Sequence, residues 1–296
     1  MDTMQQHDAK RRADSMGRYH SYFTQQRSRS PVRFLPFLLL CLVFCGCSIR
    51  PALTPREGRC EPKALPDPEV LVSLLRKMNA EPTTFSGVGR IRISRNSGTE
   101  NHSIAWLGSR PDRLRMELLD PFRRPVATLI IRGDRFFLDS KVGGESFRGH
   151  TASGAINKLL GISVPPEELV TLLSGRIPLA LGRRGRVFIE NADPDEKIYL
   201  LVFTSIIGAV REKVWISGGT DTALGYEKYG FWGTKGYEVR FSGAQSFEGV
   251  TVPEQIAVLA ETGAAIRLTV HRFQPNVEVS DEQFMVPGNA GEAGSP

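Results

Sequence analysis

The sequence of 296 residues predicts an α+β protein built on an antiparallel, incomplete (half-open) β-barrel of about eleven strands, with helices that plug or lid its cavity. Three observations favour this class. Short segments alternate apolar and polar residues, as half-buried strands do, and turn residues separate them. Three segments instead carry apolar residues at helical spacing. A sheet with this many strands curls instead of staying open and flat.

The N-terminal segment has the features of a secretory signal. Residues 27–33 carry three arginines and precede an apolar run of 11 residues, Phe34–Phe44. This run is shorter than the roughly 20 residues of a membrane-spanning helix and fits the apolar region of a signal peptide. The alternative is a buried core helix with incidental cysteines. The following Cys-Gly-Cys-Ser resembles a bacterial lipoprotein processing site, which would make Cys47 the lipid anchor.

This interpretation divides the chain into four parts. Residues 1–46 form the signal peptide with a possible upstream extension, and 47–66 form the lipidated, proline-rich tether. Residues 67–286 form the half-barrel domain, and 287–296 a flexible tail. Ser48 follows the anchor, where the Gram-negative lipoprotein rule places Asp for inner-membrane retention. The expected location is therefore the outer membrane, facing the periplasm.

Charge and reactive residues argue against other classes. The whole chain has a formal charge of +6, and residues 1–46 contain seven Lys/Arg and three Asp/Glu. The mature chain therefore has a net charge near +2, which does not indicate a nucleic-acid binder. Its second cysteine, Cys60, has no partner once Cys47 is lipidated. The histidines lack neighbours at metal-ligand spacing. We therefore expect that the protein is not an enzyme and binds no metal or cofactor.

The half-barrel domain begins with a helix and five strands. Asp67, Pro68 and Glu69 form a typical helix start. Alternating apolar residues then predict strands at five places, and turn residues separate neighbouring strands. The strands lie around Ile91–Ile93, Ile104–Leu107, Leu114–Leu118, Leu129–Ile131 and Phe136–Leu138.

Helical spacing returns in Ala152–Leu160 and Pro165–Ser174, which predict a pair of helices. About six further strands follow. They are expected at Val187–Glu190, Ile198–Phe203, Lys213–Ser217, Tyr237–Phe241, Gln255–Leu259 and Ala265–Phe273.

The inward-facing residues of the predicted sheet are almost wholly aliphatic and aromatic, which suits acyl chains. A fully packed barrel core is the alternative. The residues expected to contact acyl chains are Ile91, Ile104, Trp106, Leu114, Met116, Leu118, Leu129, Ile131, Ile156, Leu160, Leu169 and Leu173.

Four segments carry a family resemblance: "FSGVGRIRIS", "RLRMELLDPFRRPVATL", "AINKLLGISVPPEELVTLLSGRIP" and "VPEQIAVLAETGAAIRLTVHRF". Their order and spacing resemble the LolA/LolB fold family, and specifically LolB-type outer-membrane lipoprotein receptors. The resemblance implies a monomer that receives lipoproteins from a periplasmic LolA-like carrier and inserts them into the outer membrane. The alternatives are a carrier of free lipid, or a structural or assembly lipoprotein that uses the fold for protein interaction.

The resemblance also implies a role for the loop Asp120–Pro125. In the family this loop protrudes and carries one exposed apolar residue, and Phe122 stands in that position. Arg123 and Arg124 would pair with lipid phosphates, making the three residues a membrane insertion loop. The alternative is that Phe122 folds back onto the barrel edge. The aromatic stretch Tyr226–Tyr237 is either a hairpin with cross-strand aromatic pairs or a second membrane or partner contact.

Overall fold

The structure is a computed structural model that describes residues 65–141, 144–150, 152–179, 184–191, 197–220 and 222–285. The chain divides into two units, residues 1–59 and 60–296, and every described residue belongs to the second. The predicted signal peptide, the Cys47 anchor, most of the tether and the tail lie outside the described residues. They therefore stay predictions.

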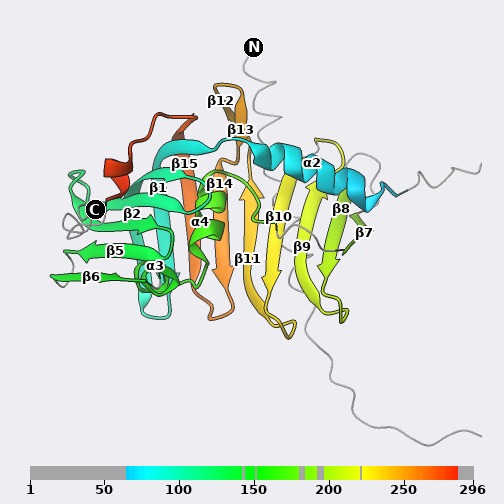
Figure 1. The fold of residues 1–296 in the computed structure, drawn as a ribbon, viewed down its shortest axis with the longest axis horizontal. Helices are drawn as coiled ribbons and strands as arrows, with labels where there is room; N and C mark the ends of the chain where they lie inside the picture. Colours follow the sequence, from blue (N-terminus) through cyan, green and yellow to red (C-terminus); the bar gives the residue numbers. More distant parts are fainter. Residues whose placement is uncertain are drawn as a thin grey trace, which may run out of the picture. The chain divides into compact units, whose positions relative to one another are not determined.

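One antiparallel sheet of thirteen strands forms the framework, in the order β6-β5-β4-β3-β2-β1-β15-β14-β11-β10-β9-β8-β7 (Figure 1). The edge strands β6 and β7 do not pair with each other, so the sheet curls without closing. This confirms the predicted α+β, half-open architecture. The strands are β1 (Thr84–Arg95), β2 (Gly98–Ser109), β3 (Arg113–Leu119), β4 (Pro125–Arg132), β5 (Arg135–Ser140), β6 (Glu145–Gly149), β7 (Arg184–Asn191), β8 (Ile198–Thr204), β9 (Val210–Ser217), β10 (Ala223–Tyr229), β11 (Lys235–Ser242), β14 (Gln255–Ala260) and β15 (Ala265–Pro275).

Two strands of this sheet, β6 and β10, were absent from the sequence prediction of about eleven. Strand β6 is short and mostly polar. Strand β10 carries the consecutive charged residues Glu227 and Lys228, so one charge points to each face of the sheet. The alternation of apolar and polar residues that marks a strand is therefore lost. A separate small hairpin, β12 (Gln245–Phe247) with β13 (Val250–Val252), was also not predicted.

Three helices lie where the sequence predicted them. Helix α2 (Pro68–Ala80) is capped by Asp67, whose carboxylate accepts the Glu69 N–H at 2.9 Å. It packs beside β7 and contributes Leu75 to the core. Helix α3 (Ala152–Leu160) contacts β4 and β5, and helix α4 (Pro166–Leu173) contacts β2 and β3. Together, α3 and α4 cover one arm of the sheet from inside.

The core is one continuous cluster on the concave face. It is closely packed where β1 meets β2, because the Trp106 ring lies directly on Gly87. A Cβ atom added at Gly87 would stand only 2.2 Å from that ring. The 3₁₀ turn η1 (Asp281–Phe284) packs against β3 and β4, and a carboxylate oxygen of Asp281 lies 2.7 Å from the Arg113 guanidinium.

Candidate functional site

All of the residues expected to contact acyl chains are buried in the concave core. The structure also leaves one small apolar cavity of about 30 Å³ between the sheet and the paired helices. Six of the expected residues line it, from β1, β2, β3, α3 and α4. The full lining is Ile91, Ile104, Met116, Leu160, Ile162, Leu169, Leu172, Leu173, Ile256, Val258, Ile266 and Leu268.

The part of this lining that comes from β14 and β15 was not among the residues expected from the sequence. Ile256, Val258, Ile266 and Leu268 alternate along the last hairpin, so the signal was present in the sequence. Conversely, Trp106, Leu114, Leu118, Leu129, Ile131 and Ile156 are core residues that do not line the cavity.

The cavity is too small for an acyl chain. A space of about 30 Å³ holds one or two water molecules and no hydrocarbon tail. The volume that a chain would need is filled by the apolar side chains of α3 and α4 themselves. Among the described residues, the space between the sheet and the paired helices is therefore closed in this conformation, and an acyl chain could enter it only if these helices moved.

A buried group of charges fastens the first turn of α4 to the concave face of the sheet. Lys228 Nζ on β10 lies 2.8 Å from Glu168 Oε1 on α4 and 2.9 Å from Glu212 Oε1 on β9. The Tyr237 hydroxyl on β11 donates a hydrogen bond to Glu168. Glu212 is fully buried, so Lys228 supplies the positive charge that this carboxylate needs.

This environment shifts the pKa values of the group. Burial lowers the pKa of Lys228. The hydrogen bonds and negative charges of Glu168 and Glu212 raise this pKa by more than burial lowers it, so the net shift is upward. Burial raises the pKa of Tyr237 strongly, and Tyr226 and Glu168 add to the shift. Lys228 therefore stays charged and Tyr237 stays a hydrogen-bond donor at neutral pH.

A cleft of about 540 Å³ opens beside this group, between α2 and α4. Arg76 and Asn79 of α2 and Glu167 and Glu168 of α4 are on its walls, and Lys228 also lines it. The cleft thus leaves one side of the first turn of α4 uncovered.

The segment after α4 is held by Arg176, a buried arginine. Its guanidinium donates to the backbone carbonyls of Glu81 at 2.7 Å and Thr251 at 2.9 Å. Burial and the positive charge of Arg110 lower the pKa of Arg176 to about 10. Arg176 therefore ties the chain that follows the lid to both α2 and the β12–β13 hairpin.

The loop between β3 and β4 is a tight turn that leaves its aromatic ring exposed. One oxygen of the Asp120 carboxylate accepts the N–H groups of Phe122 at 2.8 Å and Arg124 at 2.9 Å. Phe122 is 78% exposed, and the Arg124 guanidinium lies 5.2 Å from its ring centre. Arg123 adopts a left-handed backbone conformation. Phe122 thus does not fold back onto the barrel edge.

The aromatic stretch Tyr226–Tyr237 forms the β10–β11 hairpin. Tyr226 and Tyr237 face the core with ring centres 6.0 Å apart. Phe231 and Trp232 sit at the hairpin tip, 59% and 83% exposed, with their rings edge to face. The stretch is therefore both a hairpin with an aromatic pair and an exposed apolar tip.

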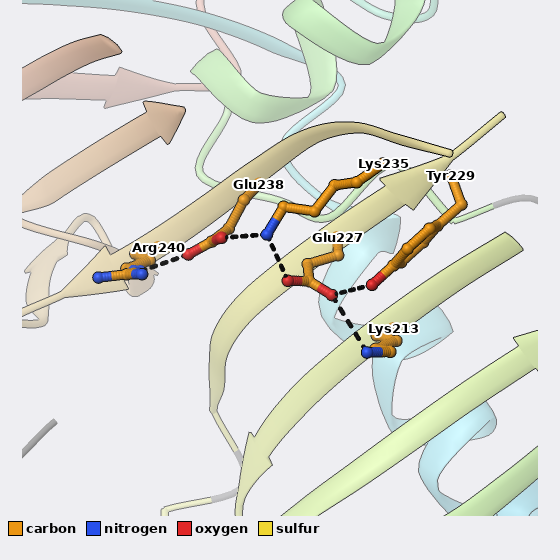
Figure 2. Close-up of polar contacts among 6 residues, drawn as sticks. All are labelled: Lys213, Glu227, Tyr229, Lys235, Glu238 and Arg240. Carbon is orange, nitrogen blue, oxygen red and sulfur yellow. Dashed lines mark hydrogen bonds and ion pairs between the residues drawn. The ribbon is translucent and has the colours of Figure 1, made fainter. Parts of the chain in front are cut away.

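On the opposite, convex face of β9, β10 and β11, alternating charges form an ion-pair network, drawn in Figure 2. Lys235 Nζ lies 2.8 Å from Glu227 and 2.5 Å from Glu238, and Arg240 lies 2.6 Å from Glu238. The Tyr229 hydroxyl donates to Glu227. Because each carboxylate of this network forms an ion pair with a cation, we interpret the network as a structural support for β10.

The described residues contain no group of three or more His, Cys, Asp or Glu side chains arranged to hold a metal ion. Within the same residues, no helix combines the length and the apolar character needed to cross a membrane.

The fold is the basis for comparison with known proteins. Neither protein-family models nor curated protein sequences match this chain. Solved structures do. A LolA superfamily protein from Nitrosomonas europaea superposes with a TM-score of 0.51 at 13% identity, covering 74% of this chain and 97% of that chain. The chain has a LolA-type fold.

Two further structures agree. A putative outer membrane lipoprotein-sorting protein domain from Vibrio parahaemolyticus has a TM-score of 0.52 at 11% identity, covering 74% of this chain and 97% of that one. A DUF1329 family protein from Desulfovibrio piger has a TM-score of 0.53 at 13% identity, covering 74% and 98%. At these identities the likeness concerns the fold, and the narrower LolB-type resemblance stays a prediction.

Proposed function

We propose that this protein is an outer-membrane-anchored lipoprotein that binds acyl chains beneath a movable lid formed by α3 and α4. In this proposal it receives lipoproteins from a periplasmic LolA-like carrier and passes them to the outer membrane. The observation that carries it is the construction of the interior. A continuous apolar concave face is covered, over β2 to β5, by two short helices whose own apolar side chains fill the space.

The lid is suited to exchange places with a ligand. Leu160, Leu169 and Leu173 lie against the sheet, and an acyl chain would bury the same surface when they withdrew. Because hydrophobic burial is non-directional, the exchange needs little net free energy. A difference of 100 Å² in buried apolar surface is worth about 2.5 kcal/mol, enough to favour transfer in one direction.

Two features support the entry and exit routes. The cleft between α2 and α4 exposes the side of the lid at the Glu168–Lys228 ion pair, so entry there requires that pair to separate. Exit into the bilayer is assigned to the membrane insertion loop, where Phe122 is exposed beside Arg123 and Arg124. The outer-membrane-sorting description of the Vibrio parahaemolyticus domain supports this class of function.

The buried Trp106 indole fits such a ligand. Its Nε1 has no hydrogen-bond partner among the described residues, although the side chain is only 3% exposed. A buried donor without a partner is unfavourable. An ester or amide carbonyl on a bound acyl group would supply the missing acceptor.

A second candidate rests on the small size of the cavity. Because the cavity between the sheet and the paired helices holds only about 30 Å³ among the described residues, the same shell is also suited to a structural or assembly lipoprotein that contacts proteins through its surface. In that case α3 and α4 are permanent core elements.

One experiment separates the two. The native protein is examined by mass spectrometry for co-purified lipid, and then by hydrogen exchange with and without a triacylated peptide. Acyl binding predicts a bound acyl mass and faster exchange in residues 152–173, with strand β8 as the internal control. A clean apo mass, no uptake of the peptide and unchanged exchange would favour the filled-core protein.

A further inference from the structure

Four hairpins of the sheet share one loop geometry. In each, the first loop residue donates its N–H to the carbonyl of the fifth, and the fourth donates back to the first. The loops begin at Asp120, Ser205, Gly230 and Ala260, with N···O distances of 2.7–3.1 Å in all four. The fourth residue has a positive φ in each: Arg123, Gly208, Gly233 and Gly263. The second and third residues form the outermost point of each tip.

Three of these tips carry large apolar residues at that outermost point. They are Phe122, then Ile206 with Ile207, then Phe231 with Trp232. Ile206 is fully exposed and Ile207 is 65% exposed. Such turn positions favour small or polar residues, and branched Ile fits them poorly. The fourth tip has Glu261 and Thr262 and shows that the geometry itself does not require apolar residues.

The antiparallel order of the sheet places all four tips on the same edge. Strands β3, β8, β10 and β14 run in one direction, and each ends at its tip. Figure 1 shows the ends of the β8–β9 and β10–β11 hairpins together at the lower edge of the view. At the opposite edge, the described residues of the β2–β3, β4–β5 and β9–β10 turns include no large exposed apolar side chain.

An arginine accompanies each of the aromatic tips. The Arg124 guanidinium lies 5.2 Å from the Phe122 ring centre, and the Arg211 guanidinium lies 5.5 Å from the Phe231 ring centre. An aromatic ring that can enter the acyl region beside a cation that can meet a phosphate matches the boundary layer of a phospholipid bilayer.

We propose that this edge of the sheet is a bilayer-contacting rim, in which the β8–β9 and β10–β11 tips enter the phospholipid interface together with Phe122. The rim sets the orientation of the domain on the membrane. Its tips are independent of the interior cavity, so the rim can operate whether or not the protein carries an acyl chain. This inference extends the proposed role of the Phe122 loop and does not depend on the lid.

Trp232 provides a direct probe, because Trp106 and Trp215 are buried, at 3% and 6% exposure. The full chain is reconstituted on phosphatidylcholine–phosphatidylglycerol vesicles whose acyl chains are brominated. We expect the Trp232 emission, obtained as the difference from Trp232→Phe, to shift to shorter wavelength and to be quenched. An unquenched Trp232 at full vesicle binding would overturn the proposal.

Two relocated probes serve as matched controls in the Trp232→Phe background. Thr262→Trp places the ring on the polar tip of the same edge, and Thr220→Trp places it at the opposite edge. The rim predicts quenching of the first and none of the second. Equal quenching of both would mean that the protein lies on the bilayer without this orientation.

The aliphatic tip is tested by replacing Ile206 and Ile207 with serine. Burial of one large side chain contributes more free energy than a tenfold change in a binding constant, so vesicle affinity measured on chains with Cys47→Ser should fall about tenfold or more. Unchanged affinity and unchanged Trp232 quenching would remove this tip from the rim. Failure of the acyl-binding function with intact Trp232 quenching would instead reject only the lid mechanism.

Discussion

Glu168 on α4 and Lys228 on β10 form an ion pair of 2.8 Å inside the concave face of the sheet. The pair joins the lid to the sheet beside the cleft between α2 and α4. Lys228 also lies 2.9 Å from the fully buried Glu212, so one ammonium group contacts both carboxylates. Glu168 is therefore the α4 side chain through which this ion pair attaches the lid to the sheet.

Replacement of Glu168 by Gln should loosen the lid without unfolding the protein. Lys228 keeps Glu212, and the amide oxygen can still accept from Tyr237. We expect a loss of about 1 kcal/mol in the free energy of unfolding and faster uptake of a fluorescent acyl probe. Stopped-flow uptake and urea denaturation measure the two effects. An uptake rate equal to that of the parent would show that this pair does not hold the lid.

The contrasting change is Lys228→Met, which removes the ammonium that lies 2.9 Å from the fully buried Glu212. Breaking a buried ion pair by removing one partner costs about 3–5 kcal/mol, because the remaining charge loses a stabilising neighbour in a place that water does not reach. We expect a much larger drop in the urea midpoint than for Glu168→Gln. Comparable midpoints for the two variants would contradict the assignment of Lys228 as the counter-ion of Glu212.

Phe122→Glu should leave acyl uptake intact and stop release into liposomes, because a carboxylate at the loop tip cannot enter the bilayer interface. The hydrogen bonds of the turn involve Asp120 and the backbone, so the variant keeps its fold. Val88→Glu, at another exposed apolar residue, is the matched control. Release of a labelled lipidated peptide is the readout, and normal release by Phe122→Glu would reject the loop's role.

The network on the convex face should make stability sensitive to acid. Burial raises the pKa of Glu227, but its bonds to Lys235 and Tyr229 lower it more, so the folded pKa lies below the ordinary value of 4.5. This contribution is fully present above the unfolded pKa and is lost as the pH falls through the folded pKa. The stability advantage of the parent over Glu227→Gln should therefore shrink below about pH 4.5 in urea titrations. A stability advantage of the parent that does not change with pH would contradict this role of Glu227.

Gly87→Ala should disturb the interior because the new Cβ would overlap the Trp106 ring at 2.2 Å. Overpacking of this kind costs about 1–3 kcal/mol. Gly154→Ala on α3 meets nothing within 4 Å and serves as the control, with a gain of about 0.5–1 kcal/mol from helix propensity. Thermal denaturation of the two variants should shift in opposite directions.

Local patterns were sufficient to predict most of the secondary structure. The Asp-Pro-Glu start of α2, the apolar spacing of α3 and α4, and the alternation in β1 to β5 each depend on neighbours within a few residues. Strand β10 was missed because Glu227 and Lys228 face opposite sides and are stabilised by partners on other strands and on α4. Such partners have no local signature.

The sequence by itself determined the fold class, the identity of the apolar face and the presence of an unusual aromatic residue in a polar loop. Only the tertiary structure decided that, among the described residues, α3 and α4 leave a cavity of only about 30 Å³ between themselves and the sheet, because packing depends on how side chains distant in sequence interlock. It also decided that three apolar tips share one edge, since strand order and direction are set by long-range pairing.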